Sequence, residues 1–159
     1  AQVTYQTQNW QTINHSAGRV SFDLPGTYAH YDTLNLSLYS VLHFDSVTLE
    51  MHYLTTTGAH VENFPVTPPT DTMATYVDSF LAGTGGQLVS QQNLVYNGSI
   101  RCKEVQVLYL NEDNVQLRTY NRFVWFNHRL YLFTATAQPA FDASLSAHRN
   151  RFFNSIRFY

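Results

Sequence analysis

The residues of this chain that could bind a metal ion lie close together in one stretch. His43, Glu50 and His52 alternate onto the same side of an expected hairpin. Imidazole and carboxylate groups are ligands of Zn²⁺, and diagonal neighbours on a sheet lie ~6–8 Å apart at Cβ. The two histidines, however, are ~13 Å apart along the strands, which is too far for one tetrahedral ion. A solvent-facing strand explains the set, so the sequence predicts no metal site and no cofactor.

Cys102 is the only cysteine, so the chain forms no disulfide within itself. A nucleophilic cysteine needs an electropositive setting and a nearby base. Arg101 and Lys103 flank Cys102, but on a strand they point to the opposite face. No histidine or aspartate is tied to the thiol by a motif. We therefore predict a buried, unreactive thiol, no catalytic residue and a protein that is not an enzyme.

Tyrosines and arginines interleave on one face of the expected sheet. This set consists of Arg118, Tyr120, Arg122 and Tyr131, with Phe133 beside them. Such faces stack bases in RNA-binding sheets, but the net charge of -2 argues against a nucleic-acid partner. Two interpretations stay open. In the first, a helix covers this face and the arginine stems pack along the rings. In the second, Arg118, Tyr120, Arg122 and Tyr131 bind a protein partner, since Tyr and Arg are frequent hot-spot residues.

The stretch from Ser99 to Ala137 positions most of these residues. Three runs rich in β-branched and aromatic residues are separated by two short polar breaks, a pattern that predicts an antiparallel meander. A two-residue loop at 127–128 pairs Phe126 with Arg129, and the break at 111–114 pairs Leu110 with Val115. One face is then expected to be a core, formed by Leu108, Leu110, Val115, Leu117, Phe123, Trp125, Leu130 and Leu132.

The N-terminal half predicts further strands and one long loop. Residues 1–18 are interpreted as an N-terminal arm, and 19–24 as a half-buried strand that ends at a Pro-Gly turn. A hairpin with its loop at Asp45-Ser46 would pair Phe44 with Val47. Residues 55–69 contain a glycine and three prolines, which predicts a long loop.

Two helices are expected. The first begins after Thr70 or Asp71 as N-cap and ends at Gly83. The apolar stripe that it would bury against the sheet consists of Met73, Tyr76, Val77, Phe80 and Leu81. The second runs from Asp142 to about Asn154 and precedes a short closing strand at 155–159.

The inner stripe of the second helix carries one charge. Arg149 lies among Leu145, Phe152 and Phe153. A charge on a buried stripe is costly unless it is paired or reaches the edge. We therefore expect the Arg149 stem to lie against Tyr120, Tyr131 or Phe133, with its charged head near the sheet margin, where it meets a carboxylate such as Glu104 or forms a cation–π contact.

These elements predict an α+β protein with an antiparallel sheet of about seven strands packed by two main helices, in one domain over 1–159. Hydrophobic residues make up 44% of the chain and charged residues only 13%. Residues 99–159 hold eight bases and four acids, whereas 1–98 hold one base and seven acids. We expect the two halves to neutralise each other in the fold. No stretch is apolar enough to span a membrane.

Several short segments resemble a known fold. They are Trp10, Arg19-Val-Ser-Phe-Asp-Leu-Pro-Gly26, Asn97-Gly98, Asn127-His-Arg-Leu-Tyr-Leu-Phe133 and Arg151-Phe-Phe-Asn-Ser-Ile-Arg-Phe158. Their order is similar to that of small bacterial exported proteins of the PsbP-like α/β/α sandwich family. That fold is named for a photosystem subunit and also occurs in a nuclear import factor that binds the GTPase Ran. The resemblance implies a fold and carries no functional residue over.

Two functions follow as hypotheses. The first is a non-catalytic accessory or binding module that is exported and acts through protein contacts, in a periplasmic or secreted location. The polar start Ala1-Gln2-Val3-Thr4, which is typical of a mature exported chain, and the lysine-poor surface favour it. The alternative is a small-molecule-binding or hydrolytic domain with its site under the 55–69 loop. The oligomeric state is left open.

Overall fold

The computed structural model describes residues 10–25, 29–32, 36–45, 52–63, 72–112, 114–126, 129–139 and 142–159. The strands are β1 Trp10–His15, β2 Val20–Pro25, β3 Ala29–Asp32, β4 Leu36–Asp45, β5 His52–Asn63, β6 Gln87–Tyr96, β7 Ile100–Leu110, β8 Gln116–Phe126, β9 Arg129–Ala137 and β10 Arg157–Phe158. The helices are α1 Thr72–Thr84 and α2 Asp142–Asn154, and a 3-10 turn spans Ser16–Gly18.

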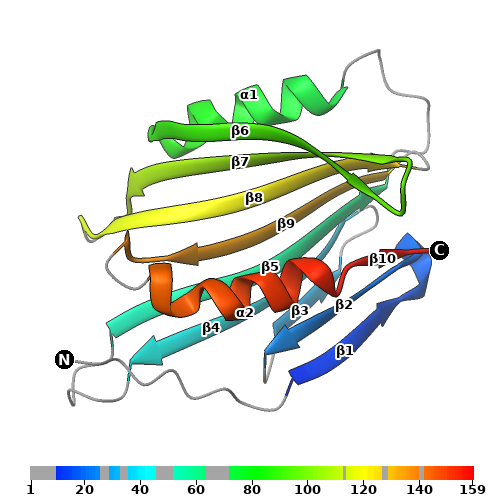
Figure 1. Ribbon diagram of the computed structural model, residues 1–159, viewed down its shortest axis with the longest axis horizontal. Coiled ribbons are helices and arrows are strands. Elements are labelled where there is room, and N and C mark those ends of the chain that lie inside the picture. Colours follow the sequence, from blue (N-terminus) through cyan, green and yellow to red (C-terminus); the bar gives the residue numbers. More distant parts are fainter. Residues whose placement is uncertain are drawn as a thin grey trace.

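Seven strands form the main antiparallel sheet in the order β3-β4-β5-β9-β8-β7-β6. The other three form a small sheet in the order β1-β2-β10. Helix α1 packs on β7 and β8, whereas α2 packs on β9 and on β2 of the small sheet. Figure 1 shows α2 and the small sheet side by side in front of the main sheet. The α+β class and the seven-stranded sheet are confirmed, but a second sheet, and not a helix alone, completes one of the outer layers.

The expected N-terminal arm is wrong over its last residues, because Trp10–His15 is strand β1. It pairs with β2 along its whole length, from Trp10 opposite Pro25 to His15 opposite Val20. Ile13 and His15 are buried while their neighbours are exposed. This alternation is the period of a half-buried strand, but a run of polar residues around two apolar ones hid it.

The expected loop at 55–69 is also wrong over its first part, because residues 55–63 belong to β5. This strand lies inside the sheet and pairs with β4 on one side and β9 on the other. Gly58 lies opposite both Ser40 and Thr134 in this ladder. Threonine is β-branched and favours strands, so the Thr-rich run forms one in spite of the glycine. Residues 64–69 lie outside the described ones.

The hairpin between β4 and β5 has a different register from the expected one. Phe44 pairs with Tyr53 and Asp45 with His52, so the connection is longer than Asp45-Ser46. Val47 lies outside the residues that the structure describes. The ladder also shifts between His43 and Phe44, an irregularity that no two-residue loop would require.

The meander confirms one predicted register and corrects the other. Phe126 pairs with Arg129, as expected. Leu110 pairs with Gln116 and not with Val115, because the turn takes in one more residue. The Asn111 carboxamide oxygen accepts a 3.0 Å hydrogen bond from the Val115 N–H, and Asn114 takes a positive φ of 58°. These contacts draw Val115 into the turn.

Because side chains alternate along a strand, this one-residue shift changes which side chains of β7 and β8 lie on the same face of the sheet. Cys102 and Leu108 therefore share the face of Val124 and Arg118, while Val105 and Val107 share that of Thr119. Val105 and Val107 therefore lie on the predicted core face, and Leu108 lies on the opposite face. Leu110 is exposed.

Each face of the main sheet has its own core. The face under α1 buries Val77, Val105, Val107 and Phe123, with Phe80, Leu81 and Leu132 partly buried against them. Phe80 meets Phe123 edge-on at 5.6 Å between ring centroids. The predicted phase of α1 is thus confirmed for Val77, Phe80 and Leu81, while the side chains of Met73 and Tyr76 lie outside the described ones.

The opposite face holds the larger core, where the small sheet and α2 meet β8 and β9. Tyr131 is central to it, with no exposed surface. Its ring meets Phe158 of β10 at 4.9 Å, and its hydroxyl donates a hydrogen bond to the Gly18 carbonyl. Only glycine fits at position 18, because a Cβ there would lie 2.5 Å from the His15 ring and 2.9 Å from the Val61 side chain. One side chain of the main sheet therefore fixes the small sheet in place.

Replacing Tyr131 by Phe tests this link. The Gly18 carbonyl would stay buried without its donor, so we expect Tyr131→Phe to lower the free energy of unfolding by ~1–3 kcal/mol. Urea denaturation measures it. Tyr159→Phe is the control, because the Tyr159 hydroxyl bonds Asn14 in an exposed setting. Equal losses in the two variants would contradict the role given to Tyr131.

Candidate binding sites

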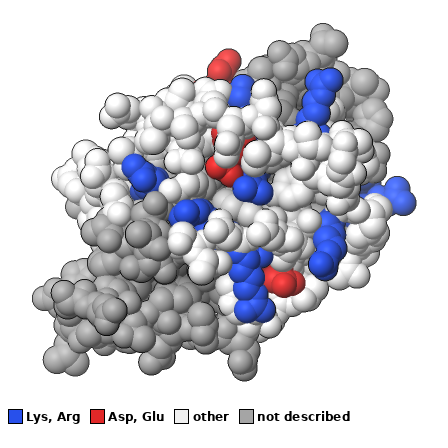
Figure 2. Space-filling model, in the orientation of Figure 1, with Lys and Arg blue, Asp and Glu red and all other residues white. Residues whose placement is uncertain are grey.

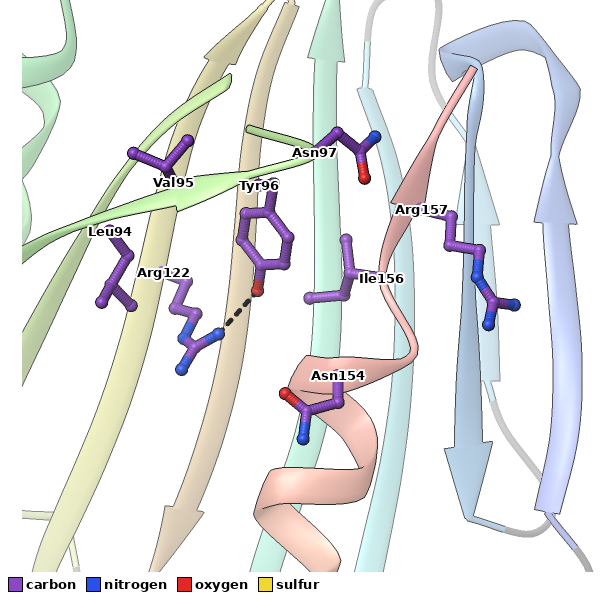
Figure 3. A pocket seen from close by; sticks show the side chains of 8 residues that line it. All are labelled: Leu94, Val95, Tyr96, Asn97, Arg122, Asn154, Ile156 and Arg157. Atoms are coloured by element: carbon purple, nitrogen blue, oxygen red, sulfur yellow. Dashed lines mark hydrogen bonds between the residues drawn. The ribbon is translucent and has the colours of Figure 1, made fainter. Parts of the chain in front are cut away.

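A pocket of about 390 Å³ opens beside the C-terminal end of α2. Four parts of the chain converge on it: the end of β6, the turn after it, β8, and the segment that joins α2 to β10. Figure 3 shows the side chains that line it, which are Leu94, Val95, Tyr96, Asn97, Arg122, Asn154, Ile156 and Arg157. Asn97 and Gly98 form the turn with positive φ values of 50° and 77°, as the Asn-Gly dipeptide predicts.

Arg122 is the charged group at the base of this pocket. Its Nε donates a 2.7 Å hydrogen bond to Glu104 Oε2, and Nη1 donates one of 2.8 Å to the Tyr96 hydroxyl, drawn in Figure 3. The guanidinium carbon lies 4.3 Å from the centroid of the Phe153 ring. The side chains of Arg122 and Glu104 are 19% and 7% exposed. Three contacts from three elements therefore fix the plane of the guanidinium.

The partners of Arg122 are themselves held in place. Gln92 Nε2 donates to the second Glu104 oxygen at 3.1 Å. The Tyr96 hydroxyl donates to the Phe153 carbonyl at 3.2 Å. Burial raises the pKa of Tyr96 to about 12, with the nearby Arg122 charge acting against it, so the tyrosine is neutral near pH 7. The network is a rigid, hydrogen-bonded support for one arginine.

The reactive state of the groups near this pocket follows from their surroundings. A nucleophile needs an adjacent base and a base needs an orienting group. Cys102 lies close to Arg122, but it is buried and burial raises its pKa to about 12. The thiol is therefore protonated near pH 7, as expected for an unreactive cysteine. The pocket instead offers a guanidinium edge, the Asn97 and Asn154 amides and an apolar wall at Ile156.

The four residues predicted to bind a partner end up in different surroundings. Tyr120 and Tyr131 are buried in the core between the main sheet and the layer of α2. Arg118 and Arg122 stay partly exposed. The Tyr120 ring lies under Arg149 of α2, whereas the Tyr131 ring is covered by Phe158 of β10, so the covering helix accounts for the first ring and the small sheet for the second. Whether any of the four contacts a partner stays a prediction.

Arg149 lies where its sequence position predicts. Its guanidinium carbon is 3.9 Å from the centroid of the Tyr120 ring. The charge thus sits over an aromatic face while the inner stripe of α2 buries Phe152 and Phe153. This cation–π contact confirms both the phase of α2 and the sheet face that it covers.

Of the three weak metal candidates, the structure describes the backbone of His43 and His52 only. The backbone places His43 opposite Thr55 and His52 opposite Asp45 in the β4–β5 ladder, and Glu50 is outside the described residues. Among the residues that the structure describes, no group of three His, Cys, Asp or Glu side chains could hold a metal ion. No described helix is long and apolar enough to cross a membrane.

Sequence reasoning missed a second pocket, of about 520 Å³, between α1, the β7–β8 turn and the main sheet. Its lining residues are Phe80, Gly83, Thr84, Tyr109, Leu110, Asn111, Glu112, Thr119, Asn121, Thr134 and Thr136. We call it the polar-floored pocket, because Thr119, Asn121 and Thr136 are buried polar residues at its base.

The floor is a hydrogen-bonded chain across three strands, β9, β8 and β7. Thr136 Oγ1 donates to Thr119 Oγ1 at 2.8 Å, and Thr119 Oγ1 donates to Asn121 Oδ1 at 3.1 Å. Asn121 Nδ2 donates to the Val105 carbonyl at 3.1 Å. The signal was present in the sequence: the β8–β9 register places Thr119 opposite Thr136 and Asn121 opposite Thr134, all on one face.

Similarity to known proteins is confined to structure. No family model and no curated protein sequence matches this chain. Among solved structures it is similar to cyanobacterial PsbP (CyanoP) from Synechocystis sp. PCC 6803, with a TM-score of 0.65 at 10% identity, over 100% of this chain and 97% of that one. This chain has the PsbP-like fold.

Two further structures share the PsbP-like fold with this chain more distantly. The PA94 protein of Pseudomonas aeruginosa, of unknown function, matches with a TM-score of 0.53 at 10% identity, over 89% of this chain and 91% of that one. The Ran-binding protein Mog1p of Saccharomyces cerevisiae matches with a TM-score of 0.50 at 8% identity, over 95% and 96%. At these identities the PsbP-like likeness establishes the fold alone.

The buried thiol and phenol predict how stability depends on pH. Burial raises the pKa of Cys102 from 9.0 and of Tyr96 from 10.0, each to about 12. As pH rises above 9, the unfolded chain loses these protons while the folded chain keeps them. The free energy of unfolding should therefore fall, by on the order of 1 kcal/mol per pH unit.

Urea denaturation at about pH 8 and about pH 10.5 measures this loss. Cys102→Ala is the matched variant, because it removes one of the two groups and should make the dependence on pH shallower. A free energy of unfolding that is the same at both pH values would show that neither group titrates differently in the folded chain.

Proposed function

We propose that this chain is a non-catalytic, exported binding module that acts through contacts with another protein. The observation that carries the proposal is the fixed guanidinium of Arg122 at a pocket on the face of α2. Arg122 bonds Glu104 and Tyr96 and lies over Phe153, so little of its conformational freedom is left to lose on binding. A preorganised side chain binds more tightly than a mobile one.

Two more arginines on the same side of the molecule are held over rings. Arg149 lies over Tyr120, and Arg151 lies over Trp10 at 4.3 Å. Both belong to α2, and Arg151 is exposed. Arginine is the residue of choice for carboxylate recognition, because its planar fork donates two parallel hydrogen bonds. These arginines therefore support a partner that presents Asp and Glu side chains.

Figure 2 shows this side of the molecule, with Lys and Arg at several separate places and Asp or Glu at few. Exposed Arg157 of β10 adds a charge beside the Arg122 pocket. A negatively charged protein surface would be steered toward it, and the association would weaken as salt is added.

The comparisons support the proposal at the level of the fold. Mog1p is described as Ran-binding, and a PsbP structure matches over the whole of this chain. The site earlier assigned to Arg118, Tyr120, Arg122 and Tyr131 is refined accordingly: Arg122 contacts the partner, and Tyr120 supports Arg149 from below. The lysine-poor, polar composition favours an extracytoplasmic location.

Charge reversal tests this proposed contact. We expect Arg157→Glu or Arg151→Glu to reduce chemical crosslinking to the partner at least tenfold in an extracytoplasmic fraction of the source cells, measured by quantitative mass spectrometry. Added salt should weaken the wild-type signal too.

Arg101→Glu is the matched control, since Arg101 is exposed and lies next to Cys102 on β7, pointing to the other face. The same change of charge there should leave crosslinking intact. Loss of signal in all three variants, or none in any, would refute a contact made by the α2 side.

A second candidate function follows from the polar-floored pocket. Its base is made of hydroxyl and amide groups from Thr119, Asn121 and Thr136, with Tyr109 and Phe80 among its walls. Such a site suits a small uncharged molecule that forms hydrogen bonds and stacks on rings. It differs from the site expected under 55–69, because residues 55–63 belong to β5.

Native mass spectrometry of the chain purified from its source tests this function. We expect a retained small molecule whose occupancy falls in Thr119→Val, a change that keeps the volume and removes a hydroxyl. Thr12→Val is the control, because Thr12 is exposed on β1. A ligand that both variants retain equally is bound elsewhere.

A further inference from the structure

Strand β6 leaves one edge of the main sheet open. It is the last strand in the sheet order and pairs only with β7 among the described strands. Figure 1 shows it at the border of the sheet. Residues 87–93 are all exposed, so no described element covers this border. An unpaired edge presents a row of backbone N–H and C=O groups to any strand that approaches.

The composition of β6 does little to protect this edge. Natural edge strands usually carry lysines, prolines or inward-pointing charges that prevent pairing. The ten residues Gln-Leu-Val-Ser-Gln-Gln-Asn-Leu-Val-Tyr contain none of these. The ladder with β7 shifts between Leu88 and Ser90, but the part from Ser90 to Tyr96 is regular. Leu88, Val89 and Val95 are three large hydrophobic residues exposed on this one strand.

We propose that β6 pairs with β6 of a second copy of this chain, antiparallel about a twofold axis at Gln92, so that the two main sheets form one continuous sheet. This inference goes beyond the proposed function and does not depend on it. A twofold axis perpendicular to the sheet places one residue opposite itself. Every other pair must then join residues at equal distances on either side of that residue.

The sequence of β6 is self-complementary about Gln92 except for one unlike pair, Ser90 with Leu94. Gln92 meets its own copy, and Gln91 meets Asn93, so amides face amides at the centre. Toward the ends, the shift around Val89 brings Leu88 and Val89 opposite Val95 of the second copy. The exposed hydrophobic residues of β6 therefore contact one another at two places in each dimer, one on either side of Gln92. No charged residue of one strand lies opposite a charged residue of the other. Cross-strand pairs of this kind stabilise antiparallel sheets.

These matches distinguish a second copy from an arbitrary peptide. An unrelated strand would have to supply an amide centre and apolar ends at the same spacing. A second copy supplies both without any other requirement, and its α1 and α2 lie on the same faces of the joined sheet as those of the first.

Sedimentation equilibrium from micromolar to hundreds of micromolar protein tests the proposal. We expect the mass to rise from 18.3 kDa toward twice that value as the concentration increases. Val89→Lys with Val95→Lys should keep the mass at that of one chain, because lysines then meet apolar residues of the second copy. Leu110→Lys is the matched control, since Leu110 is 60% exposed and Val95 is 61% exposed, yet Leu110 is not on β6.

A disulfide tests the register separately. Gln92→Cys should form a covalent dimer under mild oxidation, because residues opposite themselves have Cα atoms ~4.5–5.5 Å apart, within the range of a disulfide. Val95→Cys should not, since the two copies of residue 95 would be ~20 Å apart along the strands. Native Cys102 is buried and does not compete.

Three results would overturn the proposal. They are a single-chain mass at every concentration, a dimer that survives the lysines on β6, or faster crosslinking at position 95 than at position 92. Circular dichroism of each variant keeps these outcomes separate from unfolding.

Discussion

The packing of rings around Phe133 is the contact on which the rest of the structure depends. Phe133 of β9 meets Phe22 of β2 at 5.9 Å, Phe152 of α2 at 6.2 Å and Phe158 of β10 at 6.2 Å. One side chain in the middle of the main sheet therefore touches the small sheet twice and the helix once. The layer on this face consists of α2 and the small sheet. The two meet at the ring of Phe133. Edge-to-face rings add directional preference to the area that they bury.

That junction also explains the arrangement of the arginines. With the rings of Tyr120 and Phe153 committed to the core, their remaining faces lie at its margin, where Arg149 and Arg122 cover them. A lysine could not replace either contact fully, because only the planar guanidinium stacks and donates in the same plane. The predominance of arginine over lysine in this chain is therefore in part explained by the aromatic rings at the margin of the core, which arginine covers.

The sequence predicted most strongly where the pattern was local. The meander, both helices and the pairing of Phe126 with Arg129 all follow from runs and turns within a few residues. The prediction for Arg149 worked because a charge on an apolar stripe has few acceptable surroundings. The PsbP-like fold followed from the order of such segments.

Prediction failed where a residue acts through its partner across strands. β5 lies between two strands, so its Thr-rich sequence is stabilised by ladders on both sides that no window of the sequence contains. The β7–β8 register depended on the Asn111 side chain, which adds one residue to the turn. The polar-floored pocket required two strands to be aligned before its threonines could be seen as a set. The Arg122 pocket needed β6, β8 and α2 together, and only Arg122 of its lining was expected.

The pairing of β2 with β10 gives the chain an order of assembly. Ser21 lies opposite Arg157 and Val20 opposite Phe158, whereas β6 to β9 pair with their neighbours in sequence. Closing a short loop costs less entropy and is faster than joining segments that are far apart, so the hairpins can form early and the small sheet last. Until β10 has been synthesised and docked, the ring of Phe133 lacks one of its partners. During synthesis, that face of the sheet therefore keeps an exposed apolar surface until the last residues of the chain have been added.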